Sequence, residues 1–371
     1  MLHLIASGFY GGPERQIVQH LKRLNSGEYK GLLVSFNEYG MNNEVIEKAR
    51  SEGLACWGIP MYGPLDIRAQ WQLNALLDSE KVDLLCVHGY KACVMGWWYG
   101  IRSQTPIIAF SRGYTCENRK MAFYNWLERQ VIRRLKFIIC VSEGQKRRLI
   151  SLGINAERIK VVHNATFSNA LSTAKSSETK EIIRERLGVP KDAMMIVAAG
   201  RLSPEKGHKY LIEAAVQVKR KRTNVFFVFC GDGPCRRNLE AQARVLGVGE
   251  MCLFPGFRRD LPEIFQAMDL MVLPSLSEGL PNVVLEAFSS SKPVVATAVG
   301  GVPEVVEDAV NGLLVPPERA DLLANAIERC LESPELMRQM GDMGRKKVTS
   351  AFTFESQTRK IEAIYREVLG L

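Results

Sequence analysis

Short apolar runs alternate with amphipathic stretches of helical period along almost the whole chain. Short apolar runs that are bounded by Gly, Pro and polar residues are typical of buried strands, and the stretches between them are long enough for connecting helices. This alternation is the signature of βαβ units, in which helices cover both faces of a parallel sheet. The sequence therefore predicts an α/β fold with doubly wound parallel sheets.

The apolar runs place strands in both halves of the chain. They are expected at residues 2–6, 31–36, 83–87, 106–110, 137–141 and 159–162, and then at residues 194–199, 225–230, 270–273 and 293–296. Between the two sets, residues 164–179 (NATFSNALSTAKSSET) form a polar segment that breaks both periodicities and is typical of a hinge. Because 371 residues exceed one ordinary core, we expect two domains, with the boundary near residue 170.

The end of the chain is predicted to be a helix without a strand to follow it. Residues 352–369 are amphipathic, with Ile361, Ile364, Tyr365 and Val368 spaced along one face. An apolar face of this kind needs a partner, so this helix must pack on a core that is already built.

Composition restricts the class of protein. The chain is 46% hydrophobic and 24% charged and has no apolar run of 18 residues, as expected for a globular protein and not for a membrane-spanning one. The N-terminus lacks the features of a signal peptide, and the nine cysteines show no C-x-x-C spacing. Free thiols in a reducing compartment are therefore expected, which favours a cytoplasmic protein.

The net charge of +9 is concentrated in the first half of the chain. Residues 1–170 contain 22 Lys and Arg against 14 Asp and Glu, a surplus of eight. A basic first domain is compatible with a phosphate-bearing acceptor or an anionic membrane face, and equally with a solvated surface.

A cationic turn follows the strand expected at 194–199. Gly200 opens the segment GRLSPEKG, which contains Arg201 and Lys206 and leads into a helix. The carboxyl end of a parallel strand is where α/β sheets bind ligands, and two cations at this position favour an anion. A guanidinium and an ammonium together can neutralise a diphosphate and stabilise it as a leaving group.

A second strand end carries carboxylates. The strand at 270–273 leads into residues 277–288 (SEGLPNVVLEAF), where Pro281 fits the first position of a helix. The amino end of this helix is a second seat for phosphate. Glu278 precedes the helix and Glu286 lies in its second turn, so the two carboxylates can bind hydroxyls on either side of a diphosphate.

The segment 277–288 resembles the E-x7-E motif of the retaining glycosyltransferases of family 4, which have the GT-B fold, and residues 200–207 are similar to that family's diphosphate-binding turn. Further matches along the chain are residues 11–15 (GGPER), 231–234 (GDGP), 254–258 (FPGFR) and 300–304 (GGVPE). The resemblance implies two Rossmann-like domains that face a central cleft. These would be an acceptor-binding domain, 1–170, on which residues 353–371 pack, and a nucleotide-sugar-binding domain, 171–352.

The resemblance also assigns roles to the matching residues. Arg201 and Lys206 would hold the diphosphate, Glu278 the donor-sugar hydroxyls and Glu286 the ribose diol. Transfer would retain the anomeric configuration and need no metal or other cofactor. The other donor-binding positions would be Gly11, Gly12, Gly200, Phe257, Arg258, Gly279, Leu280, Pro281 and Asn282, with Phe257 and Arg258 flanking the nucleobase through backbone atoms.

Two positions depart from the family pattern. Pro13 stands where the family commonly has Ala, and Ala165 where it has Gly. Neither change removes a side chain assigned to chemistry, but they leave the conformations of the loop at 11–15 and of the hinge open.

Two residues of the first half are candidates for the site. His88 ends the strand at 83–87 and is expected to point into the cleft, as a structural residue or, as in the family, near the donor sugar. Arg112 follows the strand at 106–110, where it would either meet an anionic acceptor or form a structural ion pair.

Residues 121–136 combine aromatic side chains, such as Phe123 and Trp126, with basic ones, and Lys146, Arg147 and Arg148 follow. Such a stretch either lies on an anionic membrane surface or forms a helix with an apolar core face and a solvated basic face. The first reading would place the protein at the inner face of the cytoplasmic membrane. Nucleic acid is a poor fit, because no known binding module accompanies the charge.

The sequence thus favours a glycosyltransferase that uses a UDP-, GDP- or ADP-sugar and a saccharide or lipid-linked glycan acceptor, as in the synthesis of surface polysaccharide or lipopolysaccharide. A NAD-dependent oxidoreductase would share the α/β fold, but no G-x-G-x-x-G follows the first strand. A non-catalytic sugar-nucleotide binding protein and a nucleotide-sugar epimerase of the same fold stay open.

Overall fold

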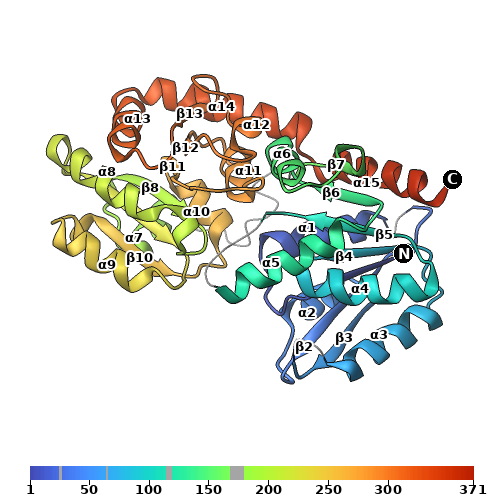
Figure 1. Ribbon diagram of the computed structural model, residues 1–371. Coiled ribbons are helices and arrows are strands. Elements are labelled where there is room, and N and C mark those ends of the chain that lie inside the picture. The colour runs from blue at the N-terminus through green and yellow to red at the C-terminus, as the bar shows by residue number, and fades with distance from the viewer. Residues whose placement is uncertain (25–26, 64–65, 114–118, 168–178) are drawn as a thin grey trace. The chain divides into compact units, whose positions relative to one another are not determined.

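The computed structural model of the chain describes residues 1–24, 27–63, 66–113, 119–167 and 179–371. It forms two compact units, one made of Met1–Asn164 with Phe354–Leu371 and the other of Ala165–Thr353 (Figure 1). The units divide between Asn164 and Ala165, whereas the sequence placed the boundary near residue 170. Most of the expected hinge, residues 168–178, lies outside the described residues.

The first unit contains a sheet of seven parallel strands in the order β3-β2-β1-β4-β5-β6-β7. Its central strands are in register, so that Leu4 lies opposite both Val34 and Val87. The strands are β1 (Leu2–Ile5), β2 (Leu32–Glu38), β3 (Cys56–Met61), β4 (Leu85–His88), β5 (Ile107–Ser111), β6 (Phe137–Cys140) and β7 (Ile159–Val161).

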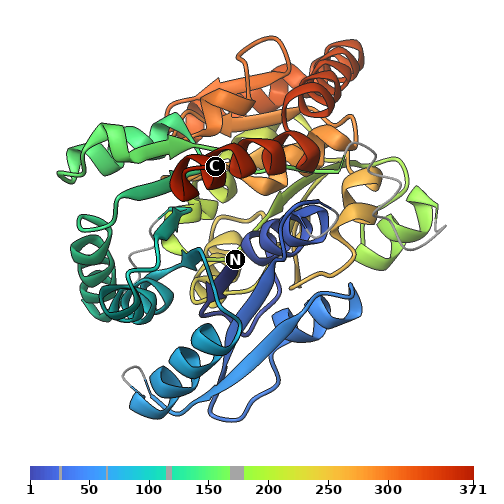
Figure 2. The same ribbon diagram turned by 90° about the vertical axis from the view of Figure 1, so that its right-hand side faces the viewer.

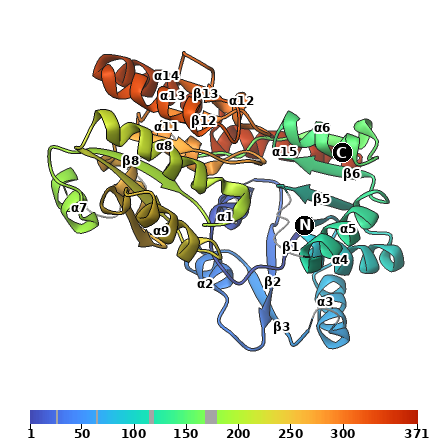
Figure 3. The ribbon, with the colours of Figure 1, turned by 60° about the vertical axis from the view of Figure 1, so that its left-hand side comes forward.

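Helices cover both faces of this sheet (Figure 3). On one face α3, α4, α5 and α6 contribute apolar side chains, among them Leu73 and Cys93, to a single core. On the other face α1, α2 and α15 do the same, for example through Leu21 and Val45. The helices are α1 (Gly12–Leu24), α2 (Glu44–Ser51), α3 (Ile67–Ser79), α4 (Tyr90–Ser103), α5 (Arg119–Ile132), α6 (Glu143–Ser151), α15 (Phe354–Leu369) and the 3-10 turn η1 (Ala156–Arg158).

The last helix of the chain, α15, belongs to the first unit and lies beside α1 (Figure 2). Its apolar face, with Ile361, Ile364 and Tyr365, is buried in the core that α1 also covers. Arg23 of α1 donates to Glu355 of α15 over 3.0 Å. The apolar face that the sequence left without a partner is therefore covered by the first unit.

The second unit contains six parallel strands in the order β10-β9-β8-β11-β12-β13. One face of the sheet is covered by α8, α9 and α13 through Leu211, Leu239 and Ile327. The strands are β8 (Met194–Ala199), β9 (Val225–Cys230), β10 (Cys252–Gly256), β11 (Leu270–Leu273), β12 (Val294–Thr297) and β13 (Gly312–Val315). The helices are α7 (Lys180–Leu187), η3 (Pro204–Lys206), α8 (His208–Lys221), α9 (Arg236–Val245), η4 (Gly249–Met251), α10 (Leu261–Ala267), α11 (Asn282–Ser289), α12 (Val302–Val305), α13 (Ala320–Glu332) and α14 (Pro334–Ala351).

Both sheets are parallel and doubly wound, which confirms the predicted α/β fold class. Three strands that the sequence did not predict, β3, β10 and β13, lie at sheet edges. Within the described ranges, none of the helices combines the length and the apolar character that crossing a membrane requires.

Candidate functional site

The second sheet reverses its winding between β8 and β11. From β8 the chain proceeds outward to β9 and β10, and from β11 it proceeds in the opposite direction to β12 and β13. In open α/β sheets ligands bind at the carboxyl ends of the two strands that flank such a switch point. The loops that follow β8 and β11 are the two segments that the sequence singled out for phosphate and carboxylate chemistry.

Glycines allow these loops to pack backbone against backbone. Gly207 adopts a φ of +62°, and a Cβ there would lie 2.1 Å from the carbonyl oxygen of Pro274. Gly300 adopts a φ of +55°, and a Cβ there would lie 1.9 Å from the carbonyl oxygen of Glu278. No L side chain fits at such distances, so glycine is required at both positions.

The loop after β9 packs against the loop after β8 in the same way, backbone against backbone. A Cβ on Gly231 would lie 1.8 Å from the carbonyl oxygen of Gly200, and the backbone N–H of Leu202 donates to the carbonyl of Asp232 over 2.9 Å. The predicted segments at 200–207 and 231–234 are thus fixed against each other at the strand ends.

Lys206 and Glu278 meet across the switch point. The Nζ of Lys206, from the loop after β8, donates to Oε1 of Glu278, from the loop after β11, over 2.7 Å. The hydroxyl of Ser275 donates to the same oxygen over 2.6 Å. The Glu278 side chain is 8% exposed and that of Lys206 24% exposed, so the carboxylate is held away from water while the ammonium stays accessible.

Ser275 was not selected from the sequence. It lies two residues after the end of β11, and a serine at that position gives no signal that distinguishes a site residue from a turn residue. Its contact with Glu278 identifies it as part of the site.

His208, the first residue of α8, lies under the cationic loop. It is buried, and burial together with the nearby charge of Lys206 lowers the pKa of its imidazole to about 4. His208 is therefore neutral at physiological pH, and it adds no charge to the two cations above it.

Arg201 is exposed at the start of the loop after β8, and Glu286 is half-buried in α11. The helix α11 begins at Asn282, and Pro281 is its N-cap with φ −75° and ψ 112°. This corrects the prediction that Pro281 is the first helical residue, since its extended ψ is that of a residue flanking a helix. Gly279 and Leu280 are buried between Glu278 and this helix.

Phe257 and Arg258 follow the edge strand β10. Phe257 is 51% exposed. The guanidinium of Arg258 makes two hydrogen bonds to Asp260, of 2.8 and 2.6 Å. The side chain of Arg258 is thus engaged by Asp260, and the roles of Phe257 and Arg258 toward a nucleobase stay predictions.

In the first unit the winding reverses between β1 and β4, and His88 is the last residue of β4. His88 is 5% exposed, and its Nε2 lies 3.0 Å from Nδ1 of His3. Burial and the charge of Arg112 lower its pKa well below the usual value. His88 lines a cavity of about 20 Å³, and the polar residues that also line it include His3, Gln16, His20, Arg112 and Gln357.

Arg112 donates through Nη1 to the carbonyl of Pro13 over 2.9 Å. Burial lowers the pKa of its guanidinium to about 10, and the nearby carboxylate of Glu14 acts in the opposite direction. Arg112 thus carries its charge next to the cavity that His88 lines.

The amino end of α1 binds a carboxylate of its own chain. Glu14 Oε2 accepts the backbone N–H of Gly11 over 3.0 Å, and α1 begins at Gly12. The roles of Gly11 and Gly12 toward a donor phosphate stay predictions. The described residues contain no group of three or more His, Cys, Asp or Glu side chains that would hold a metal ion.

Comparison with known families matches both halves of the chain. Residues 179–347 match the family model of glycosyl transferases group 1, and residues 11–165 match a glycosyl transferase 4-like domain. The first match contains Arg201, Lys206, Glu278 and Glu286.

Individual proteins with similar sequences are also glycosyltransferases. The alpha-D-kanosaminyltransferase of Streptomyces kanamyceticus is 31% identical over 66% of this chain, and the match spans 63% of that relative, less than two thirds of its length. The Escherichia coli UDP-Gal:alpha-D-GlcNAc-diphosphoundecaprenol alpha-1,3-galactosyltransferase is 26% identical over 82% of this chain and 80% of its own length.

Among solved structures, Anabaena HepE in complex with UDP-glucose superposes with a TM-score of 0.86 at 23% identity and covers 99% of both chains. At this identity the likeness concerns the fold. Together, the two family models and the matching fold show that the chain belongs to the group 1 glycosyltransferases with the GT-B fold.

Proposed function

We propose that this protein transfers a sugar from a nucleotide diphosphate sugar to a hydroxyl group of a glycan. The observation that carries the proposal is the meeting of Lys206 and Glu278 at the switch point of the second sheet, 2.7 Å apart and next to the amino end of α11. A cation and a helix N-terminus suit a diphosphate, and an adjoining carboxylate suits sugar hydroxyls. Family membership supports the same reading.

In this mechanism the charge that develops on the departing diphosphate is neutralised by Arg201, Lys206 and the N–H groups at the start of α11. Glu278 accepts hydrogen bonds from the donor sugar, and Glu286 from the ribose diol. Since two cations and a helix terminus offset the charge, no metal is required.

Transfer proceeds with retention. The acceptor hydroxyl attacks the anomeric carbon from the face of the leaving group while the bond from that carbon to the diphosphate oxygen breaks. The hydroxyl proton passes to the departing phosphate oxygen, so no side chain acts as a nucleophile. His88 would lie near the donor sugar and Arg112 near an anionic acceptor.

The relatives support a proposal for the acceptor class. One acts on an undecaprenol-linked sugar, and another is a lipopolysaccharide core biosynthesis glycosyltransferase of Rhizobium meliloti. We place this chain in the same class, with a saccharide or lipid-linked glycan as acceptor and a role in surface polysaccharide synthesis.

A thermal-shift screen of UDP-, GDP- and ADP-sugars tests the donor. A donor at 100 times its Kd stabilises the folded state by about 2.7 kcal/mol, which raises the Tm of a unit of this size by about 5–10 °C. We expect donors of one nucleotide class to raise the Tm by this amount. The same donors should release free nucleoside diphosphate when a glycan acceptor is added. Stabilisation by NADH instead, with a nicotinamide absorbance change, would identify an oxidoreductase, and donor binding without turnover on any acceptor would identify a binding protein.

We further propose that the first unit lies on an anionic membrane through α3, α4 and α5. Trp71 of α3 and Trp98 of α4 are 70% and 64% exposed, although large aromatic side chains are normally buried. Other exposed apolar side chains on these helices are Ile67, Ile101, Phe123 and Trp126. Exposed cations are Arg68 on α3, Arg102 on α4, and Arg133, Arg134 and Lys136 in the segment that follows α5. Aromatic and basic side chains together are typical of surfaces that contact anionic lipid.

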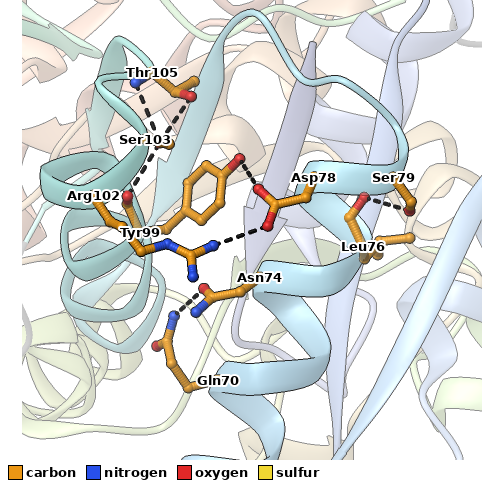
Figure 4. Close-up of polar contacts among 9 residues, drawn as sticks. All are labelled: Gln70, Asn74, Leu76, Asp78, Ser79, Tyr99, Arg102, Ser103 and Thr105. Carbon is orange, nitrogen blue, oxygen red and sulfur yellow. Dashed lines mark hydrogen bonds and ion pairs between the residues drawn. The ribbon is translucent and has the colours of Figure 1, made fainter.

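Polar contacts hold α3 and α4 together (Figure 4). Asp78 of α3 accepts hydrogen bonds from the Tyr99 hydroxyl and from Nη2 of Arg102, both over 2.9 Å. Gln70 donates to the carbonyl of Met95 over 3.2 Å. The two exposed tryptophans are thus carried on a paired, fixed scaffold.

Co-sedimentation with phosphatidylglycerol vesicles tests the membrane proposal. Replacing Trp71 and Trp98 together with serine should weaken binding at least about tenfold, since each buried aromatic side chain contributes about 1.5–3 kcal/mol. Tyr39→Ser, which removes an aromatic side chain that is 65% exposed outside these helices, is the matched control. Equal binding by the double variant and the wild type would refute the proposal.

A further inference from the structure

Three histidines, a tyrosine and a threonine form one continuous chain of hydrogen bonds in the core of the first unit. His88 Nε2 lies 3.0 Å from His3 Nδ1, and His3 Nε2 lies 3.1 Å from the hydroxyl of Tyr365. That hydroxyl lies 3.0 Å from His20 Nε2, and His20 Nδ1 lies 3.2 Å from Oγ1 of Thr358. These hydrogen bonds connect β4, β1, α15 and α1, and each of the five side chains is less than 8% exposed.

All three imidazoles in this chain are neutral. Burial lowers the pKa of His3 and of His88 well below the usual value, and that of His20 to about 3. Burial also raises the pKa of Tyr365 well above its usual value, so its hydroxyl stays protonated. Each ring therefore has one N–H donor and one nitrogen lone pair, and the donor on one ring decides the donor on the next.

Two arrangements of protons satisfy the chain. In the first, each N–H points away from His88: Nε2 of His88 donates to His3, Nε2 of His3 donates to Tyr365, Tyr365 donates to His20, and Nδ1 of His20 donates to Thr358. In the second, every one of these bonds is reversed. The thiol of Cys86, 3.6 Å from the Tyr365 hydroxyl, donates to it in either case. The two arrangements differ in whether Nδ1 of His88 carries a lone pair or a proton.

Arg112 distinguishes between them. Nδ1 of His88, Nε of Arg112 and Oε1 of Gln357 are buried polar atoms without a hydrogen-bond partner among the described residues, and all three residues line the same cavity. A guanidinium attracts the lone-pair end of a neutral imidazole and repels the N–H end. The cation therefore favours the arrangement in which every donor points away from it.

We propose that Tyr365 is a positioning residue that, through His3, holds His88 in the tautomer with its proton on Nε2 and a lone pair on Nδ1. His88 then acts toward the cavity as a hydrogen-bond acceptor. A volume of about 20 Å³ suits one oxygen atom, such as a water that accepts from Arg112 Nε and donates to both His88 Nδ1 and Gln357 Oε1. The last helix of the chain thereby sets the chemistry of a residue at the end of β4.

The tautomer follows from the first unit alone, whereas its effect on turnover rests on the proposed function. Imidazole 15N spectra of the full-length protein at neutral pH report the tautomer directly, and His88→Gln assigns the signals. We expect Nε2 of His88 to be protonated and Nδ1 to be unprotonated. Tyr365→Phe should replace this single tautomer by a mixture, because His3 then loses its hydrogen-bond partner and only the charge of Arg112 still favours the proton on Nε2 of His88. A protonated Nδ1 in the wild type, or an unchanged tautomer in Tyr365→Phe, would overturn the proposal.

Tyr29→Phe is the matched control, since its ring lies 6.2 Å from that of Tyr365 in the same core and contributes no atom to the chain of hydrogen bonds. It should leave the spectrum unchanged. In transfer assays Tyr365→Phe should lower kcat about tenfold, leaving the KM for the donor unchanged, whereas Tyr29→Phe should lower neither. A tenfold loss in Tyr365→Phe without a change of tautomer would assign the hydroxyl a merely structural role and refute the proposal. If no transfer is detected in any variant, the proposed function fails while the spectra still decide the tautomer.

Discussion

Replacing Lys206 with alanine should reduce the rate of sugar transfer about 100- to 1000-fold. The Lys206 side chain is 24% exposed in the loop after β8 and is positioned to meet the charge that develops on the departing diphosphate. Removing one such donor from a preorganised site costs about 2.7–4 kcal/mol of transition-state stabilisation. The rate of nucleoside diphosphate release under saturating donor measures the effect.

Two further variants separate chemistry from folding. Lys209→Ala removes an exposed cation three residues along the chain in α8, and it should transfer at the wild-type rate. Because Lys206→Ala leaves the buried carboxylate of Glu278 without its cation, the variant should also melt at a lower temperature. Adding Glu278→Gln removes that charge and should restore the Tm without restoring activity. Wild-type turnover in Lys206→Ala would refute the assigned role.

Replacing Gly300 with alanine should lower donor affinity at least about tenfold and destabilise the second unit by about 2–5 kcal/mol. Two costs add at this position. A left-handed φ costs an L residue about 1–2 kcal/mol, and overpacking against the Glu278 carbonyl adds about 1–3 kcal/mol. Since the clash displaces the backbone of Glu278, the carboxylate and its contact with Lys206 move with it. Chemical denaturation and donor titration measure the two effects.

Gly247→Ala separates the cost of the left-handed φ from the cost of overpacking. Gly247 has a φ of +71°, and a Cβ there would meet nothing within 4 Å. This variant carries the conformational cost alone, and it should lose about 1–2 kcal/mol of stability while it binds the donor normally. If Gly300→Ala and Gly247→Ala lost equal stability and bound the donor equally, the close packing of the two loops would have no part in donor binding.

The sequence predicted the central strands and the edge strand β7, but it missed the other three edge strands. Strands such as β8 and β11 are buried on both faces and therefore read as continuous apolar runs. The edge strand β3 contains Gly58 and Pro60, and β10 ends in Pro255 and Gly256. Proline and glycine weaken a strand signal but are tolerated at a sheet edge, where one row of backbone groups is unpaired. The remaining missed edge strand, β13, is a run of only four residues that begins with a glycine.

The segments that form the candidate site could also be predicted from the sequence, because each follows a strand. The contacts between these segments could not be predicted. Lys206 and Glu278 are 72 residues apart, and only the strand order places β8 beside β11. Strand order is a property of the whole fold, so periodicity along the chain cannot reveal it.

The hydrogen-bonded chain in the first unit shows the same limit more strongly. His3 and Tyr365 are separated by 362 residues and meet because α15 returns to the first sheet. In the sequence Tyr365 counted only as an apolar position of an amphipathic helix. Its hydroxyl gained a role once the structure placed it between two histidines.

The site of the nucleotide diphosphate is the feature on which the proposed mechanism depends. A crystal structure of the protein soaked with the nucleoside diphosphate selected by the donor screen tests it directly. The mechanism predicts the phosphates on Arg201, Lys206 and the first N–H groups of α11, with the ribose at Glu286. A nucleotide bound away from the ends of β8 and β11 would contradict it.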